Sequence, residues 1–217
     1  MTTDATPTPV ADAVRAVRTS SRRAQVLSAA ARVMQTTGYH QMSMQALADE
    51  ADISVGLIYT YFSGKQEILL ATILQILEKF RDQVEPAVQA AGDDPVARLA
   101  AGFRRYTEII DENLDAVVLT YRESRTLAAA GREQIKQLEV ATAAPLRDAV
   151  TAGVQAGVLE TDDVDLVVFD LVMLAHGWAL KHWHFAPRYT LTRYIDAQLA
   201  TLLRSLEPRH GRVVTPP

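Results

Sequence analysis

Residues 43–65 read SMQALADEADISVGLIYTYFSGK, and this stretch decides the fold of the N-terminal part of the chain. Read with a helical period, it contains two short helices, and in the second Ile58 and Phe62 stand four residues apart and share one face. Residues 51–54 leave room only for a tight turn between two steeply crossing helices. This is a helix-turn-helix arrangement, whose second helix can enter the major groove of DNA. On spacing alone, a helical hairpin in a hydrophobic core fits equally well.

The residue types in this stretch resemble the DNA-binding segment of the TetR family of one-component transcription regulators. The family pattern has a Ser or Thr before its second helix, an Ile-Ala or Leu-Ala pair, a small turn, and a Leu-Tyr-x-x-Phe run ending in Lys. Its counterparts here are Ser43, Leu47-Ala48, Asp52-Ile53-Ser54, Ile58-Tyr59-Thr60-Tyr61-Phe62 and Lys65. Ile58 replaces the usual Leu, and Tyr61 stands where His is frequent, which leaves the base preference open.

The resemblance begins near Arg22 and covers about the first quarter of the chain. It implies an all-α fold of about nine helices, in which a three-helix DNA-binding domain precedes a helical domain for ligand binding and dimerisation. It also implies a homodimer that binds double-stranded DNA at a palindromic operator, because two-fold symmetry sets two reading helices about one helical turn apart or a multiple of it. A rival reading is a helical protein-interaction module without specific DNA binding.

Several residues of the first 65 are expected to meet DNA. Ser43 and Ser54 are good helix N-caps and can also reach phosphates, and Gly56 lets the backbone approach closely. Ser63, with Gln66 three residues later, predicts a capping box whose helix N-terminus suits a phosphate. The predicted DNA-binding residues are Arg22, Ser43, Gln45, Ser54, Val55, Gly56, Tyr59, Thr60, Tyr61 and Lys65.

Composition limits the class of protein. The 217-residue chain has no cysteine, so disulfides and cysteine catalysis are excluded. Its formal net charge is -4, which argues against a generally basic nucleic-acid binder. Residues 1–65 nevertheless carry six basic against five acidic side chains, so a local basic segment must meet the phosphates. No secretory signal or membrane-spanning run is visible, and we expect a soluble, cytoplasmic protein that does not bind membranes.

The chain divides into four predicted regions. Residues 1–20 are expected to be a disordered arm, whose arginines either track phosphates or belong to a solvated tail. Residues 21–66 form the DNA-binding domain, residues 67–206 the ligand-binding and dimerisation domain, and residues 207–217 a tail. The two short helices of residues 43–65 are accompanied by further predicted helices. These cover residues 22–37, 65–91, 97–113, 114–127, 132–155 with a kink or split at Pro145, 163–181 and 191–206.

The helix over 163–181 is apolar nearly all round, which indicates burial on several sides. It is either a core helix of a monomer or, with the last helix, half of a four-helix dimer interface. The residues predicted at that interface are Phe169, Leu180, Trp183, Ile195, Leu199 and Leu202.

Polar side chains among the C-terminal helices indicate a ligand pocket, since buried polar groups need partners. Arginines of the run Tyr121–Arg125 either pair internally or bind an anion. This run and residues 177–181 resemble segments of TetR regulators that respond to acyl-CoA or fatty acids, which implies an apolar tunnel and a basic site for the headgroup. A drug-like or aromatic effector is the rival. The predicted pocket residues are Arg104, Tyr106, Tyr121, Arg122, Arg125, Met173, His176 and Trp178.

No catalytic constellation or cofactor motif is present, so an enzyme is not expected. His182 and His184 are two residues apart, which points them to different sides of a helix, and no metal site is predicted. The sequence therefore predicts a dimeric, ligand-responsive transcription regulator, a repressor or an activator, with the repressor preferred.

Overall fold

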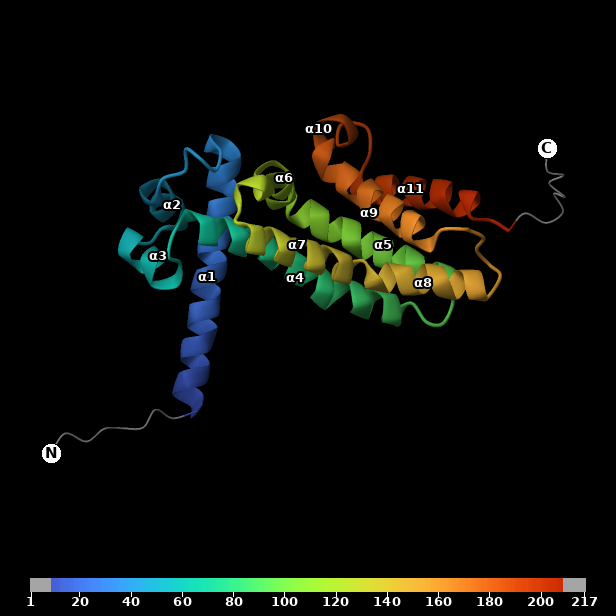
Figure 1. Cartoon of the computed structure of the whole chain (residues 1–217), viewed down its shortest axis with the longest axis horizontal. Helices are drawn as coiled ribbons and strands as arrows, with labels where there is room; N and C mark the ends of the chain where they lie inside the picture. Colours follow the sequence, from blue (N-terminus) through green and yellow to red (C-terminus); the bar gives the residue numbers. More distant parts are fainter. Residues whose placement is uncertain (1–8, 209–217) are drawn as a thin grey trace. The chain divides into compact units, whose positions relative to one another are not determined.

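The computed structural model describes the backbone of residues 9–208 and the side chains from Val17 onward. Every regular element within these residues is a helix and none is a strand, which confirms the all-α prediction (Figure 1). The chain separates into two compact units, residues 1–72 and 73–217, which are described in turn. None of the helices within residues 9–208 is both long and apolar enough to cross a membrane.

The first unit begins with α1 (Pro9–Thr37), which starts earlier than the helix predicted near Arg22. Residues 9–20 are helical, whereas an irregular arm was expected there; residues 1–8 lie outside the described part. The physical reason is local composition. Residues 11–18 read ADAVRAVR, and Ala and Arg favour a helix strongly enough to extend α1 through them.

Next come α2 (Met44–Ala51), α3 (Val55–Tyr61) and the first turns of α4 (Lys65–Ala90). Asp52 links α2 to α3 in the left-handed conformation, with φ 52° and ψ 50°, and its backbone N–H caps the end of α2. Aspartate tolerates this conformation better than most residues, so the chain can reverse in very few residues.

Helices α2 and α3 pack with α1 around one apolar core (Figure 1). Gly38 ends α1 with φ +83°, a conformation that glycine adopts readily. The core contains an apolar stripe of α1 and the inward faces of the later helices: Val26, Ala30, Val33, Met34, Leu47, Ala48, Ile58, Phe62, Ile68 and Leu69 are all buried.

The second unit contains the rest of α4 and all the later helices. These are α5 (Pro95–Glu112), α6 (Leu114–Glu123), the short 3-10 helix η1 (Ser124–Thr126), α7 (Ala129–Thr142), α8 (Ala144–Gln155), α9 (Val164–Leu180), α10 (His182–Phe185) and α11 (Leu191–Ser205). The predicted helix over 132–155 is two helices that divide at Ala143, just before Pro145, where a kink or split was expected. The four-residue α10 was not predicted.

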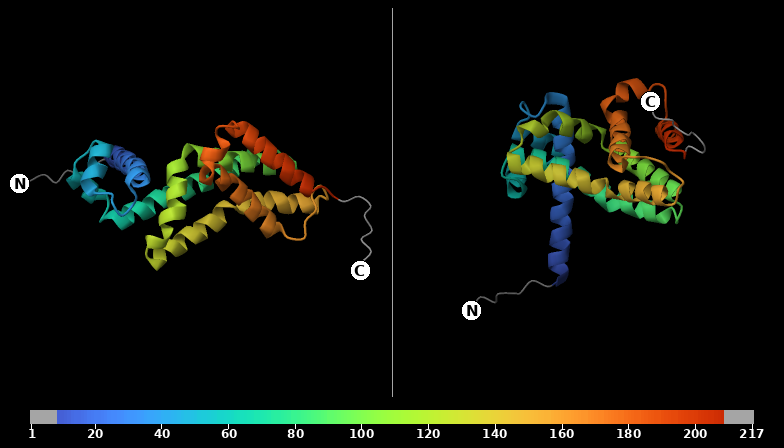
Figure 2. Two further views of the ribbon diagram at one scale, coloured as in Figure 1. Left: turned by 90° about the horizontal axis from the view of Figure 1, so that it is seen from above. Right: turned by 45° about the vertical axis from the view of Figure 1, so that its right-hand side comes forward.

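Helix α5 is the centre of the second unit, and it packs against α8, α9 and α11 (Figures 1 and 2). Leu99, Phe103, Tyr106 and Ile110 form a fully or almost fully buried stripe along it. Gly102 allows the close approach of α8, because a Cβ there would lie 2.8 Å from a Leu146 methyl carbon.

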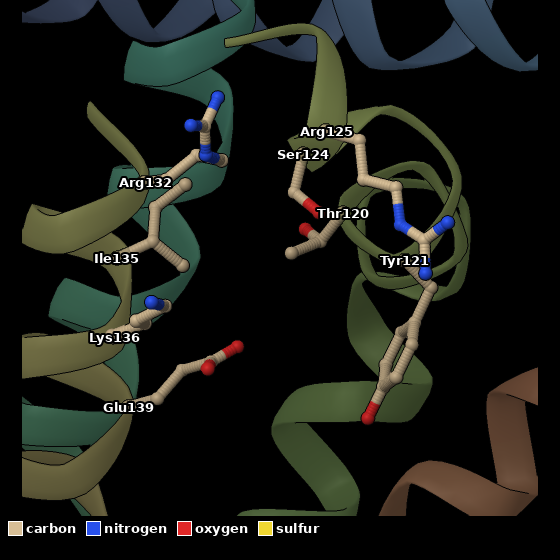
Figure 3. Close-up of a pocket in the computed structure, with 8 residues that line it drawn as sticks. All are labelled: Thr120, Tyr121, Ser124, Arg125, Arg132, Ile135, Lys136 and Glu139. Atoms are coloured by element: carbon tan, nitrogen blue, oxygen red, sulfur yellow. The ribbon is translucent and has the colours of Figure 1, made fainter. Parts of the chain in front are cut away.

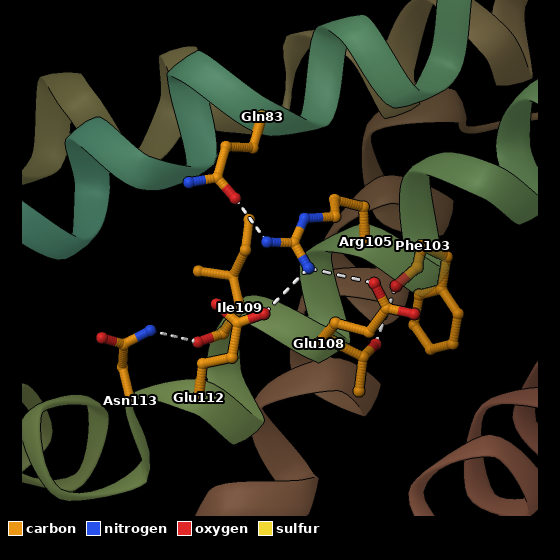
Figure 4. Close-up of polar contacts among 8 residues, drawn as sticks. Gln83, Phe103, Arg105, Glu108, Ile109, Glu112 and Asn113 are labelled. Atoms are coloured by element: carbon orange, nitrogen blue, oxygen red, sulfur yellow. Dashed lines mark hydrogen bonds and ion pairs between the residues drawn. The ribbon is translucent and has the colours of Figure 1, made fainter. Parts of the chain in front are cut away.

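Polar contacts tie α4 to α5 (Figure 4). The Arg105 guanidinium forms ion pairs with Glu108 and Glu112, each at 3.0 Å, and also donates to Gln83. The Lys79 ammonium donates to the Asn113 side chain at 2.7 Å. The charge of Arg105 is therefore paired within the protein, and this arginine stabilises the packing of α4 against α5.

Candidate DNA interface and ligand cavity

Side chains of α1 hold the ends of the reading helices. The Arg23 guanidinium donates to the Tyr61 carbonyl at 3.0 Å and lies 4.4 Å from the centre of the Phe62 ring. The Gln25 side-chain amide donates to the Ala51 carbonyl at 2.7 Å. The last carbonyls of a helix have no partner inside the helix, and these two contacts satisfy one at the end of α2 and one at the end of α3.

Helix α3 presents the side chains expected of a DNA-reading helix. The Tyr59 side chain is 54% exposed, and Gly56 and Thr60 are also exposed. The Thr60 hydroxyl donates to the Gly56 carbonyl at 3.1 Å, which leaves its methyl group as the free part of the side chain. Val55 and Tyr61 are half-buried. The second helix of the pair is thus available to an outside partner over most of its length.

The other predicted DNA-binding residues have local partners as well. Ser43 and Ser54 accept from the backbone N–H groups of Ala46 and Leu57, at 2.9 and 3.2 Å, so both are N-caps as expected. The exposed Arg22 and Gln45 side chains bond within their own helices, to Gln25 and Asp49.

The N-terminus of α4 differs from the predicted capping box. Glu67, and not Gln66, receives the hydrogen bonds from the Ser63 backbone N–H and hydroxyl, both at 2.7 Å. These bonds lower the pKa of Glu67. The Lys65 ammonium donates to the His40 carbonyl at 3.2 Å.

A cavity of about 340 Å³ opens between α6 and α7 in the second unit (Figure 3). Thr120, Tyr121, Ser124 and Arg125 line it from the α6 and η1 side, and Arg132, Ile135, Lys136 and Glu139 line it from α7. Three of these side chains are cationic and one is anionic. The outer cavity, as we call it, therefore offers a net positive wall to a ligand.

A smaller inner cavity of about 20 Å³ shares three residues with the outer one, namely Thr120, Tyr121 and Glu139. The rest of its wall is His176 and a set of apolar side chains from α4 and α6: Ile73, Ile76, Leu77, Phe80 and Val117. A charged outer cavity thus adjoins a small apolar one, and only the outer cavity is large enough for a small molecule.

The Tyr121 hydroxyl and His176 Nδ1 are 2.6 Å apart; Tyr121 lines both cavities, and His176 lines the inner one. Burial lowers the pKa of His176 to about 4 and raises the pKa of Tyr121 to about 12. Both groups are therefore uncharged at neutral pH, and the contact is a hydrogen bond between neutral partners. Met173 Sδ lies 3.9 Å from the same hydroxyl.

Some predicted pocket residues lie elsewhere. The Arg104 guanidinium pairs with Asp196 of α11 at 2.5 Å, and the Trp178 indole donates to Asp111 at 2.6 Å. Tyr106 is buried and stacks on Phe80, which lines the inner cavity, and burial raises the pKa of Tyr106. Arg122 is exposed but lines neither cavity.

Sequence reasoning missed the wall contributed by α7. Arg132, Lys136 and Glu139 recur at helical spacing with Ile135 between them, so they share one face of α7. That pattern was available in the sequence, but a charged helical face is more often simply solvated. Only the position of α7 opposite α6 turns it into a cavity wall.

Helix α9 carries an exposed apolar face. Leu166, Phe169 and Met173 follow one another along it at steps of three and four residues, and all three are exposed. Trp183, just beyond α9, is 73% exposed, and Leu180 is half-buried. Burying four large apolar groups would stabilise a partner contact considerably.

The α11 part of the predicted interface needs correction. Ile195 and Leu199 are buried within the protomer, because the inward side of α11 packs on α5. They therefore cannot contribute exposed interface surface, whereas Leu202 is half-buried. Within the described residues, no group of three or more His, Asp or Glu side chains is placed to hold a metal ion.

Comparisons with known proteins agree with this geometry. The family described as "Bacterial regulatory proteins, tetR family" matches residues 26–72, and "Tetracyclin repressor-like, C-terminal domain" matches residues 92–184. The HTH-type transcriptional regulator HbdR of Aromatoleum sp. (strain CIB) is 32% identical over 191 residues, which are 88% of this chain and 83% of HbdR. The chain belongs to the TetR family.

Solved TetR-family structures share the fold. PfmR from Thermus thermophilus matches with a TM-score of 0.74 at 23% identity, covering 82% of this chain and 97% of PfmR. AibR, solved in complex with isovaleryl coenzyme A and operator DNA, matches with a TM-score of 0.72 at 24% identity, covering 84% of this chain and 98% of AibR. Because the chain belongs to the TetR family, it is a DNA-binding transcription regulator and not an enzyme.

Proposed function

We propose that the protein is a homodimeric repressor that binds a palindromic operator through α3 and leaves it when an acyl-CoA binds in the second unit. The observation that carries the effector assignment is a cationic cavity that adjoins an apolar one. The outer one has three cationic side chains, Arg125, Arg132 and Lys136, and the inner one is walled mainly by apolar groups. Coenzyme A thioesters combine an anionic phosphate-bearing part with an acyl chain, in the same order.

The proposed operator contacts come from the exposed side of α3 and from the helix ends around it. Tyr59 offers its hydroxyl to a phosphate, and Thr60 offers its methyl group to a thymine methyl. Ser43 and Ser54 lie at the starts of α2 and α3, where free backbone N–H groups favour an anion. Lys65 and Arg22 add positive charge on the same unit. The family membership supports this assignment of the first unit.

The proposed dimer uses the exposed apolar face of α9 together with Leu180, Trp183 and Leu202. A second copy of the chain would cover Phe169, which is 59% exposed in the protomer. Two-fold symmetry then presents two α3 helices to two equivalent half-sites, which accounts for a palindromic operator. We place this activity in the cytoplasm, where the DNA of a bacterium lies.

Release of DNA follows from linkage. An acyl-CoA weakens operator binding only to the extent that it binds the DNA-free form more tightly than the DNA-bound form. Helix α4 runs from the first unit, at Lys65, into the inner cavity wall, at Ile76 and Phe80. It is therefore the covalent element through which an occupied cavity can bias the first unit.

Selection from random duplexes followed by a binding titration tests this proposal. Enrichment of an inverted repeat, and weaker binding to it when acyl-CoAs of four to sixteen carbons are added, are the expected results. Failure to enrich any sequence even at low salt would instead favour a helical protein-interaction module. A repeat that is bound but indifferent to every acyl-CoA would reject the effector assignment alone, and transcription in vitro then separates repression from activation.

A further inference from the structure

Glu139 stands at the junction of the two cavities, because its side chain lines both of them. Its carboxylate points from α7 into the space that faces α6, as Figure 3 shows. No hydrogen bond or ion pair to that carboxylate occurs within residues 17–208, although its backbone carbonyl accepts from the Thr142 hydroxyl. Burial raises the pKa of Glu139, and no cation among the same residues compensates for it.

The cationic side chains are placed differently. Arg125, Arg132 and Lys136 line the outer cavity, and none of them lines the inner one. Along α7, Arg132 precedes Glu139 by seven residues, which corresponds to about 10 Å of helix. The Arg132 guanidinium also donates to the Leu127 carbonyl, a contact that holds it away from Glu139. The sign of the wall thus changes only in the last turn of this face of α7, from positive at Arg132 and Lys136 to negative at Glu139.

This change of sign discriminates between ligands that share an acyl chain. A coenzyme A thioester has no charge at its acyl carbonyl, and its phosphates are a long pantetheine arm away. A short free acid has its negative charge only a few carbons from the end of its chain. If that chain lies at the Glu139 end of the outer cavity, the acid places its carboxylate near Glu139, where like charges repel.

We propose that Glu139 is the specificity-determining residue that admits short-chain acyl thioesters and rejects the corresponding free acids. This inference rests on the proposed acyl-CoA function and names the group that selects the ligand class. Glu139 discriminates only against free acids with short acyl chains. A long-chain acid such as palmitate can leave its carboxylate beside Arg132 and span the distance past Glu139 with methylene groups, so Glu139 does not exclude it.

The test uses Glu139→Gln in the full-length protein, with Glu133→Gln as the matched control. Glu133 lies on the same helix and lines neither cavity, and its carboxylate is 3.9 Å from the Lys136 ammonium. Both variants change the net charge by the same amount. Because the Glu139 carboxylate has no partner among the described residues, its replacement by an amide should leave the fold intact, which thermal unfolding checks.

Hexanoate, hexanoyl-CoA and palmitate are titrated into all three proteins by calorimetry. Glu139→Gln should bind hexanoate at least about tenfold more tightly than the unchanged protein, with hexanoyl-CoA and palmitate altered less than about threefold. Glu133→Gln should match the unchanged protein for every ligand.

Three results would overturn the inference. One is an unchanged hexanoate affinity in Glu139→Gln, and another is an equal gain in Glu133→Gln. The third is tight binding of decyltrimethylammonium by the unchanged protein and its loss in Glu139→Gln. Glu139 would then belong to a site that binds cations. Absence of hexanoyl-CoA binding in all three proteins, with operator binding intact, would instead reject the acyl-CoA function on which this inference depends.

Discussion

Arg23 and Tyr61 are joined across 38 positions of sequence by a hydrogen bond from guanidinium to backbone carbonyl, 3.0 Å long. The same guanidinium covers the Phe62 ring, where a cation can interact with the π-system. The bond reaches the carbonyl of the last residue of α3. Arg23 thus fixes the end of the reading helix, although it lies on α1 and is not itself expected to contact a base.

Replacing Arg23 with Met should weaken operator binding about tenfold, since a hydrogen bond from a charged donor contributes about 1.5–3 kcal/mol. If Arg23 acts only by positioning α3, the salt dependence of binding stays the same. Fluorescence anisotropy at several salt concentrations measures both quantities.

The neighbouring variant Arg22→Met is the comparison. Arg22 is exposed and its hydrogen bond stays within α1, to Gln25, so we expect it to contact a phosphate. Its loss should lower the salt slope by about two, one for each protomer of the dimer. An equal decrease in slope for Arg23→Met would show that Arg23 contacts DNA directly.

Gly56→Ala separates stability from DNA binding. A Cβ at Gly56 has open space around it, with no atom within 4 Å. The substitution should therefore stabilise α3 by up to about 1 kcal/mol, since glycine is a poor helix former. If the backbone at Gly56 lies against DNA, operator affinity falls while the melting temperature rises. A variant that is more stable and binds the operator equally well would show that Gly56 does not contact DNA.

The sequence predicted the first unit better than the second for a physical reason. Caps and turns are local, so Ser43 and Ser54 could be assigned from their neighbours in the chain. The capping partner of Ser63 was predicted one residue too early, at Gln66 instead of Glu67, because both side chains can accept the same bond. The start of α1 was predicted too late, because the Thr and Pro residues before it outweighed the Ala-rich segment.

The cavity could be predicted only in part, because its walls come from helices that are distant in sequence. Tyr121, Arg125 and His176 were predicted from their polarity among apolar helices, and all three line a cavity. Arg104 has the same character, yet it pairs with Asp196, which is 92 residues away. Polarity marks residues that need partners, but it does not say whether the partner is a ligand or another helix.

His176 should make stability depend on pH. Burial lowers its folded pKa to about 4, below the ordinary value of 6.5, so the unfolded chain binds the proton more readily between these values. Unfolding is therefore favoured as pH falls through this window, and the contribution between pH 7 and pH 5 is about 2 kcal/mol. His176→Gln keeps an acceptor for Tyr121 but cannot titrate.

Chemical denaturation at both pH values measures this effect. The unchanged protein should lose about 2 kcal/mol more than His176→Gln on acidification. Equal losses in the two proteins would mean that His176 takes up its proton as readily in the folded state as in the unfolded one.

Phe169→Glu should abolish the dimer by placing a charge on the exposed face of α9. Val140→Glu is the matched control, because Val140 on α7 is 63% exposed and lies outside that face. Analytical ultracentrifugation should give a monomer for the first variant and a dimer for the second. A dimer for both would place the interface elsewhere. Monomeric Phe169→Glu should also lose most of its operator affinity, because it can occupy only one half-site at a time.

Operator affinity with and without ligand tests the account most directly. The selected inverted repeat is titrated with the full-length protein by fluorescence anisotropy, first alone and then with saturating short-chain acyl-CoA. We predict binding as a dimer, with a dissociation constant that rises at least about tenfold when the acyl-CoA is present. A specific repeat whose affinity is unaffected by acyl-CoAs of every length would contradict the ligand response, and binding without sequence preference would contradict the assigned function.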